Sequence, residues 1–244
     1  MIEELKIATF MAEADEKISS AIKIIKDTNI DNIVFTNTGE YTLQEYITLM
    51  KASEIGVVGM DIKSEQSAFN YEYYKDLALA LNPKFAIYNW DGTDIDPVFL
   101  DRFIDCSIQG NFTPMLCMNN IKNTLKPRDK QLDKILNTSR RLHLCLDPVE
   151  IVLRYNIDIY DEYFKKYYNK IGALVVRDYK IGVGNRPVGY GSIRWREIFG
   201  HLDKYNGWLI FKPSLGTRYN NLVNRGDIFK ASYSAFVELV ETCQ

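Results

Sequence analysis

The sequence predicts a single (β/α)8 barrel of the α/β class, formed by residues 1–244 as one domain. Three observations support this prediction. Short apolar or β-branched runs alternate with helical patterns, and eight such units of roughly 30 residues follow one another along the chain. The length of 244 residues is close to that of a typical barrel of this kind. No linker, low-complexity tract or internal repeat divides the chain.

The expected strands are short runs rich in apolar and β-branched residues. They cover residues 6–10, 32–35, 57–61, 85–88, 113–117, 142–146, 173–176 and 207–212. Each is followed by an expected helix, and these helices cover residues 16–28, 43–53, 69–81, 97–108, 128–141, 159–170, a segment after Trp195, and 226–241. In the first helix Ile18, Ala21, Ile22 and Ile25 recur at the spacing of one helix face. Pro83 ends the third helix.

An open, doubly wound sheet is the rival arrangement of such alternating units. A dinucleotide-binding sheet of that type carries a glycine-rich loop after its first strand. Residues 10–15 contain no glycine. A closed barrel, built from right-handed βαβ steps, therefore fits better.

Composition limits the function classes. The 30 basic and 32 acidic residues give a net charge of −2, so no overall electrostatic attraction to nucleic acid or anionic membranes is expected. The first residues lack the pattern of a signal peptide, and no run reaches membrane-spanning length. The 4 cysteines lie far apart without a C-x-x-C pair, so we expect reduced core thiols in a cytoplasmic protein.

Barrel enzymes place their sites where strands end and the following loops begin. In this chain those positions carry carboxylates, amides, cations and an aromatic side chain, a mixture that suits a polyhydroxylated ligand. The candidate residues are Asp61, Trp90, Asn119, Asp147, Glu150, Arg177, Asp178, Arg186, Lys212 and Arg218.

Two motifs carry a family resemblance. Residues 144–148 read LCLDP, and residues 186–195 read RPVGYGSIRW, which is similar to a Pro-Gly-x-Gly-x-x-x-Trp pattern with Val188 in a slot that often holds proline. With the order of elements over 171–212, these motifs resemble the xylose-isomerase-like TIM barrels. That family comprises sugar and sugar-phosphate isomerases and epimerases and includes endonuclease IV.

The resemblance implies a divalent metal such as Mn or Zn, held by Glu, Asp, His and Glu on the last four strands. Asp147 matches the Asp position, but Val175 replaces the His and Lys212 replaces the last Glu. The first Glu position falls on Met118 or Asn119. Valine has no donor atom, lysine adds positive charge, and methionine sulfur suits hard cations poorly. We therefore expect no metal and no other cofactor, with the metal site largely lost.

Lys212 could supply the positive charge that the metal normally supplies, by pairing with Asp147. Three roles are open to it: an electrostatic clamp on a substrate carbonyl oxygen, a Schiff-base nucleophile, or a structural plug in an inactive site.

The resemblance implies an isomerase or epimerase of a small hydroxy-carbonyl compound. Asp147 or Glu150 would act as the base and Lys212 would stabilise the enolate oxygen, whereas the other candidates would bind substrate. Arg177, Arg186 and Arg218 could bind a phosphate there. The alternative is a non-catalytic barrel that binds a sugar-like ligand or a protein partner. The acidic candidates could also be helix caps or turn formers.

The expected partner is a small sugar-like or phosphorylated molecule, with no nucleic acid and no membrane. DNA repair by a trinuclear zinc site needs many histidines, and the chain has 2. A relocated metal site that recruits Glu13 or Glu65 from loops would lack rigid support. The tyrosine-rich segments 71–74 and 163–168 could supply an interface between copies of the chain or simply a helix face.

Overall fold

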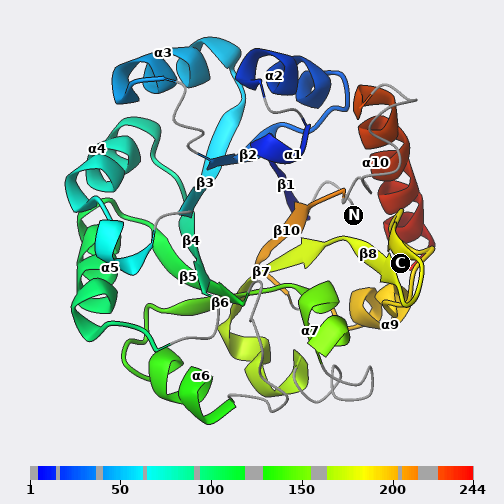
Figure 1. Cartoon of the computed structure of the whole chain (residues 1–244). Coiled ribbons are helices and arrows are strands. Elements are labelled where there is room, and N and C mark those ends of the chain that lie inside the picture. The colour runs from blue at the N-terminus through cyan, green and yellow to red at the C-terminus, as the bar shows by residue number, and fades with distance from the viewer. Residues whose placement is uncertain are drawn as a thin grey trace. The chain divides into compact units, whose positions relative to one another are not determined.

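The computed structural model describes residues 5–14, 17–36, 41–62, 65–90, 94–118, 129–154, 164–202, 205–213 and 225–243. Eight strands form a closed barrel in the order β1-β10-β7-β6-β5-β4-β3-β2, and β8 and β9 form a separate two-stranded sheet (Figure 1). The predicted (β/α)8 barrel is confirmed as the fold class. The chain divides by its internal contacts into two compact units, which are described in turn.

The first unit comprises Met1–Asp31, Asp147–Lys166 and Ala173–Gln244. Its strands are β1 (Lys6–Phe10), β10 (Trp208–Phe211) and most of β7 (Ile171–Val176). β10 is the middle strand and is parallel to both neighbours, and Phe211 is the partner of Thr9 on β1 and of Val176 on β7. Because Phe211 and Val176 are partners, the residues after them leave the two strands at the same edge.

Helices of the first unit bury apolar faces. They are α1 (Met11–Ala14), α2 (Ile18–Lys26), α7 (Pro148–Arg154), α9 (Trp195–Gly200) and α10 (Arg225–Thr242). Ile18, Ala21 and Ile25 of α2 are buried, as their spacing predicts. The ring of Phe211 stacks on Phe236 of α10 at a centroid distance of 5.6 Å. Aromatic packing of this kind fixes α10 against β10.

The second unit comprises Asn32–Leu146 and Tyr167–Gly172. Its strands follow one another in sequence order, each parallel to the next. They are β2 (Asn32–Thr36), β3 (Gly56–Ile62), β4 (Phe85–Trp90), β5 (Thr113–Met118) and β6 (His143–Leu146). Nearly all their side chains are buried, which agrees with the continuous apolar runs that predicted them.

The helices of the second unit lie outside these strands (Figure 1). They are α3 (Leu43–Ser53), α4 (Tyr71–Leu81), α5 (Pro97–Gln109) and α6 (Asp129–Leu136), with a short 3₁₀ helix, η2 (Gln66–Ala68). Their ends follow capping rules: Thr42 and Glu45 form a capping box at α3, and Asp96 caps α5 with Pro97 in the first turn. α4 ends at Asn82 in the left-handed conformation, directly before Pro83.

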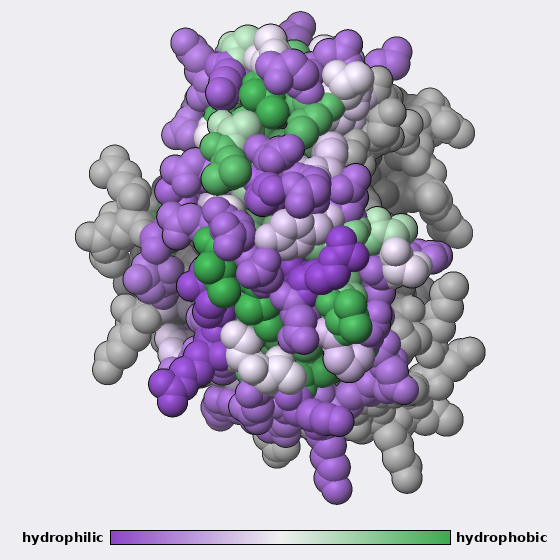
Figure 2. Space-filling model, turned by 90° about the vertical axis from the view of Figure 1, so that its left-hand side faces the viewer, coloured by the Kyte–Doolittle hydropathy of each residue, from purple (hydrophilic) through white to green (hydrophobic). Residues whose placement is uncertain are grey.

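Figure 2 shows the side of the molecule on which α4 and α5 lie. Hydrophilic side chains there surround separate groups of hydrophobic ones (Figure 2). The exposed hydrophobic side chains of these two helices are Leu79, Val98 and Ile108. Tyr71 donates a hydrogen bond to Asp105 Oδ2 within the chain, over 2.6 Å. This face gives no specific support to the predicted homo-oligomer, which stays a prediction.

Three segments differ from the sequence prediction. The helix expected at 128–141 ends at Leu136. Just after it, Thr138 Oγ1 donates a hydrogen bond to the carbonyl oxygen of Ile135 over 2.7 Å, which satisfies a backbone acceptor at the end of the helix. α7 begins directly after β6, well before the helix expected at 159–170. Of that expected helix, the described part comprises one helical turn from Phe164 and the 3₁₀ helix η3 (Tyr168–Lys170).

The third difference is a β-hairpin that follows the strand expected at 173–176, in a segment where no strand was expected. β8 (Asp178–Lys180) is antiparallel to β9 (Gly184–Arg186). Gly182 and Gly184 have φ values of 76° and 105°, which glycine adopts without strain, and so the chain can reverse direction between them.

None of the helices described here is long and apolar enough to cross a membrane. All 4 cysteines are free thiols, and Cys106, Cys117 and Cys145 are buried, as predicted. Burial raises the pKa of Cys106 to about 12, which disfavours the thiolate form that reacts.

Candidate functional site

Asp147 follows β6 directly and caps the N-terminus of α7. Asp147 Oδ1 accepts a hydrogen bond from the backbone N–H of Val149 over 3.1 Å. The carbonyl oxygen of Asp147 accepts from the backbone N–H of Ile151 over 3.3 Å, and Pro148 occupies the first helical position of α7. Asp followed by Pro is a favoured start for a helix. The cap fixes the Asp147 carboxylate, which is only 4% exposed.

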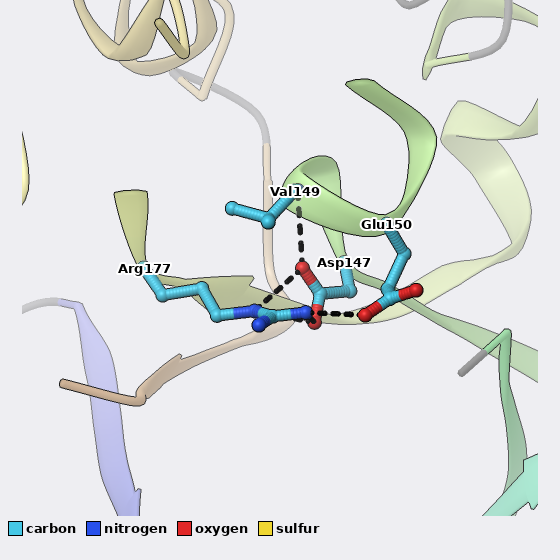
Figure 3. Close-up of polar contacts among 4 residues, drawn as sticks. All are labelled: Asp147, Val149, Glu150 and Arg177. Carbon is cyan, nitrogen blue, oxygen red and sulfur yellow. Dashed lines mark hydrogen bonds and ion pairs between the residues drawn. The ribbon is translucent and has the colours of Figure 1, made fainter. Parts of the chain in front are cut away.

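Arg177 joins Asp147 to Glu150, and the three side chains are called the arginine cluster below (Figure 3). Arg177 Nε donates to Asp147 Oδ1 over 3.1 Å and to Oδ2 over 2.8 Å. Arg177 Nη2 lies 2.7 Å from Asp147 Oδ2 and 2.7 Å from Glu150 Oε1. One guanidinium thus holds two carboxylates that come from the first turn of α7 and its cap.

Burial by itself lowers the pKa of Arg177, but the nearby carboxylates of Asp147 and Glu150 outweigh it and hold the pKa well above its usual range. The guanidinium therefore stays charged. The remaining terminal nitrogen, Nη1, has no hydrogen-bond partner among the residues that the structure describes.

Lys212 was the cation expected beside Asp147, and the structure shows Arg177 in contact with that carboxylate. The backbone N–H of Lys212 donates to the carbonyl oxygen of Val176 over 3.0 Å, which extends the ladder between β10 and β7. Its Nζ lies 5.4 Å from the ring centroid of Phe10, a cation–π distance. An ion pair between Lys212 and Asp147 stays a prediction.

Asp178 organises the loop that resembles the family pattern. Its Oδ1 accepts from the backbone N–H groups of Tyr179 (2.8 Å) and Ile193 (3.2 Å), and its Oδ2 from those of Gly189 (2.9 Å) and Gly191 (3.0 Å). Burial raises the pKa of the Asp178 carboxyl group, and these N–H groups oppose the rise by stabilising the carboxylate. These contacts agree with the alternative interpretation of Asp178 as a residue that forms the turn.

The glycines of this loop have a physical reason. A Cβ on Gly191 would overlap Oδ1 and Cγ of Asp178, and Gly189 has a φ of 88°. Tyr190 lies between them and is 68% exposed, so the loop presents an aromatic ring at the surface.

A second polar cluster lies in the other unit, at the ends of β2, β3 and β4. Asp61 Oδ2 accepts from Thr36 Oγ1 over 3.2 Å, and Asp61 Oδ1 accepts from Asn89 Nδ2 over 2.5 Å. Asp61 was expected at a strand end, whereas its hydrogen bond from Thr36 was not. Thr36 and Asp61 are partners in the strand register, and that pairing could have been inferred had the register been known.

The other candidates are placed as follows. Trp90 ends β4 and is 1% exposed, so its ring is covered and presents no face for sugar stacking in this structure. Arg186 is half-buried on β9, in register with Asp178. Asn119 and Arg218 lie outside the described residues.

The described residues do not fit the divalent metal that the family resemblance implies. They contain no group of three or more His, Cys, Asp or Glu side chains that could hold a metal ion. Val175, at the position of the expected histidine, is 2% exposed on β7. Both oxygens of Asp147, the one matching ligand, already accept hydrogen bonds from Arg177. A guanidinium occupies the carboxylate that would contact the metal.

Comparison with solved structures identifies the fold. An L-ribulose 3-epimerase superposes with a TM-score of 0.68 at 14% identity, covering 98% of this chain and 95% of that one. A xylose isomerase domain protein from Alicyclobacillus acidocaldarius gives 0.70 at 9% identity, covering 98% and 99%. The chain has the xylose-isomerase-like TIM-barrel fold.

A sugar phosphate isomerase/epimerase from Parabacteroides distasonis shares this fold too, with a TM-score of 0.64 at 10% identity, covering 98% of this chain and 95% of that one. The resemblance read from the two sequence motifs is confirmed at the level of the fold. No family model matches the sequence, and no curated protein matches it. At identities this low the reaction must be argued from the side chains.

Proposed function

We propose that this barrel is a metal-independent isomerase or epimerase of a small, sugar-like hydroxy-carbonyl compound. The observation that carries the proposal is the arginine cluster. A family ligand position, Asp147, is retained at the carboxyl end of β6, and the permanent cation beside it is the guanidinium of Arg177. Such a cluster combines carboxylate acceptors with fixed donors, and no metal is needed to balance the charge of Asp147.

The chemistry would be a proton transfer next to a carbonyl group. A carboxylate removes a proton from the carbon beside the carbonyl, and the electron pair moves to the carbonyl oxygen, giving an enediolate. In an isomerisation a proton is added to the former carbonyl carbon, while the hydroxyl proton moves to the former carbonyl oxygen and the other oxygen becomes the new carbonyl. In an epimerisation a proton is added to the opposite face of the same carbon and the original carbonyl re-forms. A cation that contacts the oxygen stabilises the enediolate, and Lys212 is the candidate for that role.

Glu150 is the better base of the two carboxylates. Asp147 accepts hydrogen bonds on both oxygens, from the Val149 N–H and from Arg177, so its lone pairs are committed. Glu150 contacts Arg177 through Oε1, and its side chain is 11% exposed whereas that of Asp147 is 2% exposed, so a ligand reaches Glu150 more readily. Asp147 would then be a positioning residue that holds the guanidinium.

A second candidate is a barrel that binds a sugar-like ligand without chemistry. The specific observation in its favour is also the arginine cluster, because the ion pairs tie up the carboxylates that a base would need free. The two candidates predict different behaviour in the same experiment.

The experiment follows hydrogen exchange in deuterated water. Chelator-treated protein, with its residual metal content measured, is incubated with neutral ketoses including L-ribulose, and proton NMR follows deuterium incorporation at the carbons next to the carbonyl. Under the enzyme proposal wild type exchanges these protons without added Mn²⁺, Zn²⁺ or Mg²⁺, and Glu150→Gln does not. Ligand-induced stabilisation without exchange would favour the binding protein. Exchange that appears only after a metal is added would refute the metal-independent proposal.

The ligand partner, the absence of nucleic-acid and membrane partners, a homo-oligomer and a cytoplasmic location are also proposals. The charge balance supports the absence of nucleic-acid and membrane partners, and the widely spaced cysteines support a cytoplasmic location. The polar residues at the strand ends support the ligand, and the tyrosine-rich segments 71–74 and 163–168 support the homo-oligomer.

A further inference from the structure

One edge of the Arg177 guanidinium is held by carboxylates and the other is accessible. An arginine side chain has five N–H donors, one on Nε and two on each terminal nitrogen. Nε contacts Asp147, and Nη2 contacts Asp147 and Glu150, which accounts for three donors. The two donors of Nη1 have no partner among the described residues.

Nη1 reaches the accessible surface of the side chain. The Arg177 side chain is 11% exposed. In the described part of the chain, the buried side-chain nitrogen and oxygen atoms without a partner are Tyr73 Oη, Arg194 Nε and Trp195 Nε1. Nη1 does not belong to that set, so its unused donors are not sealed inside the protein. An oxygen atom the size of a water molecule can therefore touch Nη1.

The guanidinium is also preorganised for such a ligand. Nε and Nη2 are fixed by contacts of 2.7–2.8 Å to two carboxylates, and one of these carboxylates is itself fixed by the Val149 N–H. The plane of the guanidinium, and with it the direction of both Nη1 donors, is therefore set before any ligand arrives. Binding to donors that are already oriented loses little conformational entropy.

The charges of Asp147 and Glu150 determine which kind of ligand oxygen can bind at Nη1. Two carboxylates face one guanidinium, so an incoming carboxylate or phosphate at Nη1 would meet the repulsion of Asp147 and Glu150. A neutral carbonyl or hydroxyl oxygen would not. We propose that Nη1 of Arg177 binds the neutral hydroxy-carbonyl end of the ligand and that the arginine cluster rejects carboxylates and phosphates at this position. This inference rests on the proposed function and names the part of the ligand that meets Arg177.

A matched pair of five-carbon compounds tests the inference. L-ribulose ends in a neutral hydroxy-ketone, whereas L-ribonate ends in a carboxylate. Binding of each is measured by calorimetry and by the shift in melting temperature of the whole chain. We expect L-ribulose to bind the wild type at least tenfold more tightly than L-ribonate. Equal or tighter binding of L-ribonate, or no binding of L-ribulose, would overturn the inference.

Two variants sharpen the test. Glu150→Gln removes one negative charge and keeps an oxygen that can accept from Nη2, so the preference for L-ribulose over L-ribonate should fall by about tenfold. Arg177→Lys keeps the positive charge but loses the planar guanidinium with its fixed donors, and should weaken L-ribulose binding at least tenfold. Arg102→Lys, at an exposed position on α5, is the control and should bind as wild type does. Circular dichroism and melting temperature verify that each variant is folded.

The outcomes separate this inference from the proposed function. L-ribulose binding that depends on Arg177, without hydrogen exchange, would support the inference and refute the isomerase. Hydrogen exchange that Arg177→Lys leaves unchanged would support the isomerase and overturn the inference. A Glu150→Gln variant that folds and still prefers L-ribulose as strongly as wild type would overturn the charge argument.

Discussion

Replacing Arg177 by methionine should be among the most destabilising single changes in this protein. The substitution keeps much of the aliphatic length but removes the guanidinium from two carboxylates that are 2% and 11% exposed in their side chains. It breaks three nitrogen-to-oxygen contacts of 2.7–2.8 Å and leaves buried charges without a cation. Removing one partner of a buried ion pair costs about 3–5 kcal/mol. For a chain of this size, that corresponds to a decrease of about 10 °C in melting temperature.

Urea unfolding followed by circular dichroism measures this cost, with a combined variant as the rescue. When Arg177→Met is combined with Asp147→Asn and Glu150→Gln, no uncompensated carboxylate remains, and most of the lost stability should return. Arg102→Met on the exposed surface of α5 should stay within about 0.5 kcal/mol of wild type. A cost below about 1 kcal/mol for Arg177→Met, or a combined variant no more stable than the single one, would show that the cluster is not the buried ion-pair network described here.

Three further predictions concern other sites. Gly191→Ala should cost about 2–4 kcal/mol in urea unfolding because its Cβ overlaps the Asp178 carboxylate, whereas Gly200→Ala, with nothing within 4 Å of the new Cβ, should be neutral or slightly stabilising. Asp178→Asn should cost about 2–3 kcal/mol in the same assay, because an amide nitrogen must face backbone N–H groups that now donate to a carboxylate oxygen. Burial, helped by the charge of Lys170, lowers the pKa of His143 in the folded protein below 6.5. Neutral His143 therefore contributes to folding stability above pH 6.5, and this contribution is lost as the pH falls through the lower pKa of the folded state. The unfolding free energy of wild type should therefore fall more steeply between pH 7.5 and 5.5 than that of His143→Gln, and equal slopes would refute this assignment.

The strands could be predicted because burial on both faces leaves a continuous apolar run, as in β4, where only Asn89 is not fully buried. The helix ends near Thr42 and Asp96 follow side-chain caps that are local in sequence. The hairpin of β8 and β9 was missed because it has three residues per strand, too few for an alternating pattern to be recognised.

The start of α7 could have been predicted. Asp147 and Pro148 are a standard helix start, and Glu150 in the first turn strengthens it. That signal was given a catalytic interpretation, so the capping role was considered only as an alternative. In the structure the Asp147 side chain caps α7 and contacts Arg177 at the same time.

The members of the arginine cluster were predicted one by one, but their pairing was not. With the metal expected to be absent, another positive charge was expected beside Asp147. Lys212 was the candidate because it stands where the family resemblance expects a carboxylate. Arg177 follows β7 and reaches the same carboxylate with a planar fork that contacts both oxygens and Glu150. Motif positions give the residue types at a strand end, whereas the reach and shape of each side chain decide which of them meet.

Asp147 and Asp178 are two buried carboxylates that are stabilised in different ways. They are linked because Arg177, which contacts Asp147, directly precedes Asp178 in the sequence. Asp147 is balanced mainly by a side-chain cation, whereas Asp178 is held by four backbone N–H groups of its own hairpin and the following loop. Because Asp178 follows Arg177 directly, anchoring the Asp178 backbone also restrains the Cα from which the guanidinium extends. We therefore expect the loop glycines that the Asp178 carboxylate requires to influence the direction of Nη1 of Arg177 through this backbone connection. On this reasoning, a loop variant such as Gly191→Ala should weaken ligand binding at Arg177 as well as lower stability, because both effects pass through the same carboxylate.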